Sequence, residues 1–320
     1  MLRLTLLFLC LSVFSPDVWS QSWPSRSVRM IVPFPAGGAT DAPARLLAEK
    51  LSEKWKQSVV VENRTGAGGS IGAAEAARSA PDGYTMLIPS GALLTASQYV
   101  QSTLPYNPEA DFELITKLVA GPQVFVVPAR SRFASMRELL DFARQNPRKL
   151  SYGHAGIGSQ SHLAGEYFLL ASGVDAEQVP YKGDPPAAAD LIGGVLDFGV
   201  LNLAAVAGHI ESGRIRALAL TTPSPLPLLA RIPLVADSLP GFDNAGWFGL
   251  VVPKGVPPEV TRRIAQDTHA VLAAPDVRAR LEGLGFTVIG NTPQEMRAEV
   301  EAERRRWERV VRERKIKVSP

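Results

Sequence analysis

Two stretches of this chain place glycine and hydroxyl residues directly before a predicted helix. Residues 33–41 hold Gly37 and Gly38 and follow the apolar run 30–32, and residues 154–162 hold Ser159 and Ser161 and follow a short strand pattern. Backbone N–H groups at a helix start carry partial positive charge and favour an anion. These residues therefore offer a site for a carboxylate or a phosphate. A glycine turn that only joins strand to helix is the alternative for the first stretch, which alone does not decide between them.

Groups that catalyse reactions are sparse. The sequence has no H-E-x-x-H, C-x-x-C or P-loop motif, and the loop around Ser159 lacks the G-x-S-x-G pattern of a nucleophile elbow. His154 and His162 flank that loop, either as a base beside a serine or, more commonly, as histidines that hydrogen-bond the loop. His209 and His269 are too scattered for a metal site. We therefore expect no catalytic residue, no metal and no cofactor.

Positive charge is also scarce in the predicted loops, where Lys182 is the one full charge. A bound anion would depend on backbone N–H groups and hydroxyls rather than on an arginine clamp. Lys182 either faces the ligand or is solvated at the rim of a cleft.

A glycine cluster at residues 66–72 invites a dinucleotide interpretation. Ile71, however, stands where the third glycine of the G-x-G-x-x-G fingerprint would be, and no acidic residue follows a second strand at the proper distance. These departures disfavour nucleotide binding.

Strand and helix patterns alternate along the first part of the chain. Residues 42–55 repeat apolar side chains at helical spacing, between strand patterns at 30–32, 59–63 and 84–88. This βαβαβ order predicts an α/β fold with a parallel, doubly wound sheet. Thr40 or Asp41 is expected to cap the first helix.

Two apolar runs, residues 124–128 and 247–253, are predicted to carry the chain into a second domain and back, which makes a hinge. The last predicted helix, residues 293–314, places Met296, Val300, Trp307 and Val311 on one face, which we expect to pack against the first domain.

Composition indicates an ordinary globular chain. It has 320 residues and a formal net charge of +3, with much of the basic excess in residues 304–317, where glutamates are interleaved. That mixture indicates a solvated helix face and not a nucleic-acid surface, because no DNA- or RNA-binding motif accompanies it.

The N-terminus has the layout of a secretory signal. Arg3 precedes the apolar run 4–14, and Ser15-Pro16 breaks the run before Ser20. We expect cleavage near Ser20 and an exported, soluble product. Cys10 is the only cysteine and lies in the signal, so the mature chain would have no disulfide.

Several further motifs occur in order from about Trp23 to the last helix. They are the loop at 33–41, Val61-Glu62-Asn63-Arg64 with the glycine cluster, Pro81-Asp82-Gly83-Tyr84-Thr85, Leu104-Pro105-Tyr106-Asn107-Pro108, residues 158–166 and Val179-Pro180-Tyr181-Lys182-Gly183. Together they resemble the tripartite tricarboxylate transporter receptors, the Bug-type periplasmic solute-binding proteins. Two departures bear on the ligand: Leu201 replaces an acid before Asn202, and Thr95-Ala96 replaces an Asn-Pro pair.

The resemblance implies a two-domain periplasmic-binding-protein fold of type II, the Venus-flytrap kind, with residues 1–20 as signal peptide, 21–122 plus 248–320 as the first domain and 123–247 as the second. It also implies a monomeric receptor that captures a small carboxylate, such as a di- or tricarboxylate or an acidic amino acid, and delivers it to the permease subunits of a tripartite tricarboxylate transporter. Presentation of the ligand to a membrane sensor is the alternative, and an enzyme of organic acids is a weaker one. The ligand-binding residues that we expect are Phe34, Ala36, Gly37, Gly38, Asp41, Ser90, Gly91, Gly156, Gly158, Ser159, Ser161, His162, Tyr181, Lys182 and Asn202.

Overall fold

The computed structural model describes residues 23–222 and 231–316 of the chain. The predicted signal peptide, with Cys10 and the cleavage position near Ser20, lies outside these residues, as do residues 223–230. Within the described residues no helix is both long and apolar enough to cross a lipid bilayer.

The first lobe is built on a parallel sheet. Its central strand β1 pairs in parallel with β2 on one side and β3 on the other, and its side chains are buried on both faces, as a parallel strand between helices requires. The elements of this lobe before the first crossing are β1 (Val28–Val32), α1 (Asp41–Trp55), β2 (Val59–Asn63), η1 (Ala67–Gly69), α2 (Ser70–Ala77), β3 (Thr85–Leu87), α3 (Gly91–Thr95) and α4 (Ser97–Val100).

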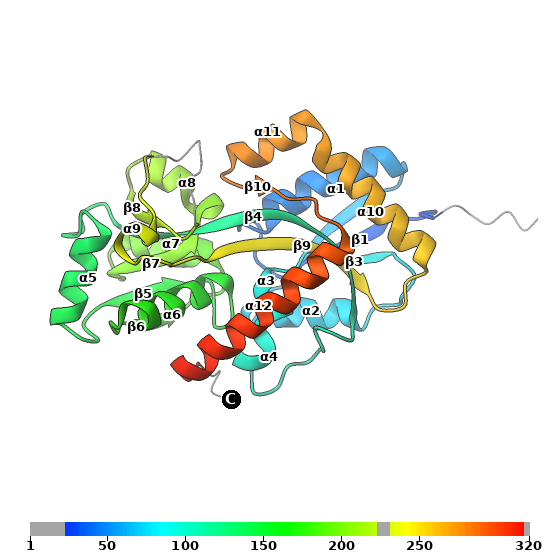
Figure 1. Cartoon of the computed structure of the whole chain (residues 1–320). Helices are drawn as coiled ribbons and strands as arrows, with labels where there is room; N and C mark the ends of the chain where they lie inside the picture. The colour runs from blue at the N-terminus through cyan, green and yellow to red at the C-terminus, as the bar shows by residue number, and fades with distance from the viewer. Residues whose placement is uncertain (1–22, 223–230, 317–320) are drawn as a thin grey trace, which may run out of the picture.

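Two long strands, β4 (Phe112–Pro128) and β9 (Ala245–Pro253), run side by side across the middle of the molecule (Figure 1). They pair antiparallel from Phe112↔Pro253 to Pro122↔Ala245. The crossing predicted at 124–128 is thus the last part of one continuous strand that begins in the first lobe. The predicted domain limits at 122/123 and 247/248 fall inside these strands and stay a prediction.

The second lobe repeats the plan. Strand β5 pairs in parallel with β6 and β7, and β7 and β8 pair antiparallel with the far end of β4. Its elements are α5 (Met136–Gln145), β5 (Ser151–His154), α6 (Gln160–Ser172), β6 (Glu177–Pro180), α7 (Asp184–Gly193), β7 (Phe198–Asn202), α8 (Leu203–Glu211), β8 (Ile215–Leu220) and α9 (Val235–Ser238).

After β9 the chain stays on the first lobe until the last helix. The remaining elements are α10 (Pro258–Ala273), α11 (Pro275–Gly283), β10 (Thr287–Val288) and α12 (Pro293–Arg314). The fold is therefore the predicted α/β fold of two lobes joined by two crossing segments. Separate apolar cores cover the sheet faces of each lobe.

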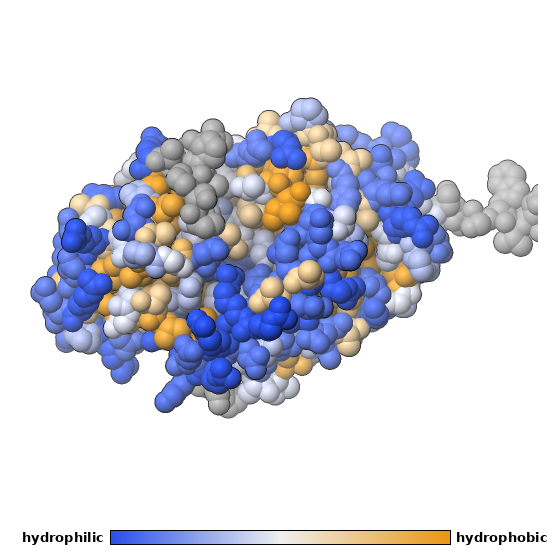
Figure 2. All heavy atoms as spheres, in the orientation of Figure 1, coloured by the Kyte–Doolittle hydropathy of each residue, from blue (hydrophilic) through white to orange (hydrophobic). Residues whose placement is uncertain are grey.

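Helix α12 lies across both lobes (Figure 1) and begins with a capping box formed by Thr292 and Glu295. Met296 and Val300 pack in the first lobe, as predicted. Trp307, Val310 and Val311 join a cluster with Ala92, Ala96 and Val100 of the first lobe, as predicted, and the same cluster also includes Leu163 of α6 in the second lobe. The opposite face of α12 is hydrophilic (Figure 2).

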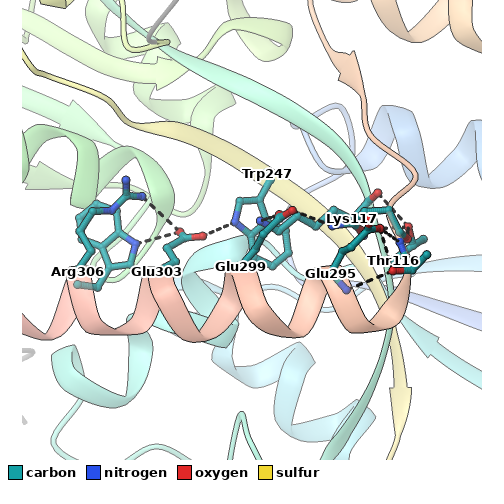
Figure 3. Close-up of polar contacts among 10 residues, drawn as sticks. Thr116, Lys117, Trp247, Glu295, Glu299, Glu303 and Arg306 are labelled. Atoms are coloured by element: carbon teal, nitrogen blue, oxygen red, sulfur yellow. Dashed lines mark hydrogen bonds and ion pairs between the residues drawn. The ribbon is translucent and has the colours of Figure 1, made fainter.

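Glu303 of α12 holds two indoles at the crossing (Figure 3). Its Oε2 accepts a 2.6 Å hydrogen bond from Trp247 Nε1 of β9, and its Oε1 accepts one of 3.0 Å from Trp307 Nε1. Lys117 of β4 lies 4.4 Å from the Trp247 ring centroid and pairs with Glu299 at 2.6 Å. These contacts fix α12 to both crossing strands.

We predict that E303Q destabilises the protein, because a glutamine side chain offers one acceptor oxygen to two indole N–H groups. One indole N–H left without an acceptor should lower the free energy of unfolding, measured by urea denaturation, by about 1–3 kcal/mol. E308Q on the exposed face of α12 is the matched control and should change it by less than about 0.5 kcal/mol. Equal effects of the two substitutions would contradict a role for the Glu303 carboxylate.

Candidate ligand-binding site

The N-terminal ends of α1, α6, α7 and α8 meet at a small cavity of about 20 Å³ between the lobes, which we call the inner cavity. It lies beyond the carboxyl ends of β1, β5 and β7, where ligands bind in open α/β sheets. The lining residues are Phe34, Pro35, Gly38, Ala39, Thr40, Ser90, Gln123, Ala155, Ser159, Gln160, Ser161, Gly183, Asp184, Asn202 and Phe248.

The loop before α1 forms one wall. The Asp41 carboxylate accepts hydrogen bonds from Gly37 N at 3.0 Å and from the Arg45 side chain, which hold the loop closed on itself. Thr40 occupies the N-cap position without a side-chain cap, so the predicted capping by Thr40 or Asp41 is wrong. Among the described residues no acceptor is recorded for the N–H groups of Ala39 and Thr40, which line the cavity.

The loop before α6 forms the opposite wall. Ser159 caps the helix through a 3.2 Å bond from His162 N to its Oγ, and Ser161 Oγ accepts from Ala155 N at 2.9 Å. The N–H groups of Gln160 and Ser161 have no acceptor within the described chain, as expected of the first helical positions. The two walls thus present unbonded donors at helix N-termini, which together favour an anion.

Buried polar atoms without partners surround the same cavity. Ser90 Oγ, Gln123 Oε1, Gln160 Oε1 and Asn202 Nδ2 have no hydrogen bond within the described residues. Ser90, Gln123 and Asn202 are each at least 97% buried. Because nearly all buried polar atoms in proteins are paired, these atoms indicate that a polar ligand or ordered water completes the site.

A wider cavity of about 560 Å³ adjoins the inner one, and we call it the outer cavity. Phe34, Pro35 and Ala155 line both cavities. The glycine cluster at 66–69 lines the outer cavity, together with Gly156, Tyr181 and Lys182.

The lobes touch at the rim of the cleft. A Cβ on Gly68 would lie 2.3 Å from the carbonyl oxygen of Ile157, and one on Gly183 would lie 2.8 Å from Pro35. The backbones of the two lobes therefore approach closely here, and the cleft is in a closed form.

His154 and His162 are structural. Nδ1 of His162 accepts from Gly158 N at 3.1 Å, Nδ1 of His154 accepts from Gly156 N at 3.2 Å, and the two rings lie 4.5 Å apart. Burial lowers the pKa of His162 to about 4 and, with the neighbouring imidazole, that of His154 to about 3. The interpretation as histidines that hydrogen-bond the loop is confirmed. The described residues also contain no cluster of His, Cys, Asp or Glu able to hold a metal ion.

The predicted site residues fall into three groups. The inner cavity brings together Phe34, Gly38, Ser90, Ser159, Ser161 and Asn202, and the outer cavity takes Gly156, Tyr181 and Lys182. The remaining ones, Ala36, Gly37, Asp41, Gly91, Gly158 and His162, line neither cavity. Most of these shape the walls: Asp41 and His162 accept loop N–H groups, and Gly91 makes room for the Trp247 ring, which lies 2.5 Å from the position of an added Cβ.

Gln123, Gln160 and Asp184 line the inner cavity and are not among the predicted site residues. Gln160 is the first residue of α6, a position that the predicted helix start already marked. Asp184 is the first residue of α7. The departures at Leu201 and Thr95 lie in packed interior positions and line neither cavity.

Comparison with known proteins decides the family. Residues 43–316 match the family described as tripartite tricarboxylate transporter family receptor. This chain belongs to that family. A related protein, BugT of Bordetella pertussis, is 34% identical over 96% of this chain and 95% of its own length.

Solved structures of similar receptors have the same fold. An R. palustris protein, Rpa4515, solved with adipate, is 36% identical with a TM-score of 0.89, covering 92% of this chain and 100% of that one. MatC of Rhodopseudomonas palustris, solved with bound malate, is 29% identical with a TM-score of 0.85, covering 90% of this chain and 100% of that one. The resemblance is therefore confirmed, and this tricarboxylate-transporter receptor is a binding protein and not an enzyme.

The buried histidines predict a pH-dependent stability. In the unfolded chain both histidines bind a proton below about pH 6.5. In the folded chain His162 binds one only below about pH 4 and His154 only below about pH 3, so the stability of the folded state is lost as pH falls. Burial raises the pKa of Asp184 to about 6, which acts in the opposite direction between about pH 6 and 4. Two histidines against one aspartate leave a net difference of one proton, so the free energy of unfolding should fall by about 1.4 kcal/mol per pH unit as pH falls from about 6 to 4.

H162N should make this dependence shallower, because asparagine keeps an acceptor for Gly158 N but does not titrate. The measurement is urea unfolding of the ligand-free protein in small pH steps between 6.5 and 4, beside the same series for H269N in the first lobe. A slope that H162N leaves unchanged would show that His162 binds its proton equally well in both states.

Proposed function

We propose that this receptor binds a small organic acid by its carboxylate in the inner cavity, in the periplasm, and delivers it to the membrane subunits of a tripartite tricarboxylate transporter. The observation that carries the proposal is the set of unbonded N–H groups of Ala39, Thr40, Gln160 and Ser161 facing one cavity from two helix starts. The adipate and malate in the similar R. palustris structures support a carboxylate ligand.

Backbone donors alone are sufficient to hold the anion here. None of the described residues that line the inner cavity is a lysine, arginine or histidine. Hydrogen bonds from N–H groups to a carboxylate are charge-assisted, and the low dielectric of a closed cleft strengthens them. The helix dipoles of α1 and α6 point their positive ends at the same place.

A proline at position 160 tests one donor. Proline is tolerated at the first position of a helix, where its missing N–H has no partner in the helix, and Ser159 already has the extended backbone that precedes a proline. Q160P should weaken carboxylate binding about tenfold to a hundredfold relative to Q160A, measured by calorimetry.

Q160A is the matched control, because it also removes the side-chain bond to the Trp247 carbonyl but keeps the N–H. Equal affinities of the two variants would show that the Gln160 N–H does not contact the ligand.

Native mass spectrometry of the purified protein, followed by thermal-shift measurements with dicarboxylates, tricarboxylates, acidic amino acids and aromatic acids, identifies the ligand. A ligand at a hundred times its Kd should add about 2.7 kcal/mol to the stability of the folded state.

Delivery to a permease predicts that deletion of the gene abolishes uptake of the radiolabelled ligand by intact cells. Expression of the full chain, with its N-terminal segment, should restore uptake. Normal uptake by the deletion strain, with a lost transcriptional response to the ligand, would favour presentation to a sensor instead.

A further inference from the structure

Among the described residues, the charged side chains that line the two cavities are those on either side of Gly183. Within the described part of the chain, Lys182 is the one charged residue of the outer cavity and Asp184 the one charged residue of the inner cavity. Lys182 is exposed and Asp184 is 9% exposed. The inner cavity is therefore lined by a buried carboxylate and the outer cavity by a solvent-exposed ammonium group.

Asp184 lies at the start of one helix that faces the inner cavity and contacts the cap residue of another. It is the first residue of α7, and its Oδ1 accepts a 3.2 Å hydrogen bond from N–H of Asn202, the N-cap of α8. No lysine, arginine or histidine pairs with it among the described residues. At neutral pH most of its population is ionised, since burial raises its pKa only to about 6. The free donors of α1 and α6 line the same cavity.

We propose that Asp184 is a specificity-determining residue that limits the inner cavity to one ligand carboxylate and directs a second carboxylate of the ligand to the outer cavity, toward Lys182. This inference rests on the proposed function and narrows its substrate class to monocarboxylates and to extended dicarboxylates. Compact dicarboxylates would be disfavoured.

Charge in a small, buried space separates the two kinds of ligand. A short dicarboxylate held by its first carboxylate at Ala39 and Gln160 would keep its second carboxylate near Asp184, and no described cation lines the inner cavity. Like charges at low dielectric repel strongly. A longer ligand extends along Phe34, Pro35 and Ala155, which line both cavities, and its second carboxylate then reaches solvent and the Lys182 ammonium group.

The test is calorimetric titration of the purified protein with matched acids: butyrate and succinate, hexanoate and adipate, octanoate and suberate. The wild-type protein should bind suberate or adipate at least about tenfold more tightly than succinate. D184N, which is isosteric and uncharged, should raise the ratio of succinate to butyrate affinity about tenfold. K182M should weaken suberate up to about fivefold and leave octanoate unchanged, because Lys182 is exposed and its field is screened.

D141N is the control, since Asp141 is an exposed residue of α5 in the same lobe and the substitution changes net charge equally. The assignment would be overturned if D184N altered the affinities for butyrate and succinate by the same factor. It would also be overturned if the wild-type protein preferred succinate to suberate. Thermal unfolding of D184N establishes that it is folded. Binding of none of these acids would overturn the narrowed substrate class, and the proposed function itself fails only if the wider panel of organic acids is not bound either. Binding with ratios that D184N does not change refutes only the role of Asp184.

Discussion

The antiparallel pairing of β4 with β9 is the constraint on which the rest of the molecule depends. Each strand belongs to both lobes, so the register between them fixes how the two sheets face each other. The crossing pairs glycine with glycine, Gly121 with Gly246. A Cβ on Gly246 would lie 2.4 Å from Gln160 Oε1, and one on Gly121 would lie 3.1 Å from Asn202 Nδ2. Because these two positions have no side chain, the side chains of Gln160 and Asn202 from the second lobe can pack against the backbone of β9 and β4.

The site that results is polar through its backbone more than through its side chains. Helix N-termini from both lobes converge on one cavity, and Asp184 supplies an internal anion for α7 and α8 while the donors of α1 and α6 stay free. Such a site recognises the charge and planar shape of a carboxylate and leaves the remainder of the ligand to the walls. Specificity must then come from the few side chains that differ in charge or volume around the anion.

Local patterns in the sequence were enough for the elements but not for the cavity. Helix α12 was predicted with its observed bounds, because a proline at its start and an apolar stripe are local signals. The predicted cap of α1 is absent: Thr40 makes no side-chain cap, and the Asp41 carboxylate accepts from Gly37, Arg45 and Asn63. Gln123 was missed because nothing near it in the sequence marks it; it reaches the cavity only through the long-range register Gln123↔Asn202. The contact of α12 with the second lobe was missed for the same reason, because Leu163 lies far away in the chain.

The contacts of α12 with the second lobe bear on how the cleft admits a ligand. Arg314 pairs with Glu166 of α6 at 3.1 Å, and Glu166 also accepts a 2.7 Å bond from Tyr152, so this acid is held from both lobes. Entry of a ligand requires the rim at Gly68 and Ile157 to separate, and rotation about β4 and β9 alone would strain the apolar cluster of Trp307 with Leu163. An open form must therefore break the Arg314 pair or slide α12 over α6. The ligand stabilises the closed form only by the difference in its affinity for the two states, which the free N–H groups of both lobes supply when they meet one carboxylate.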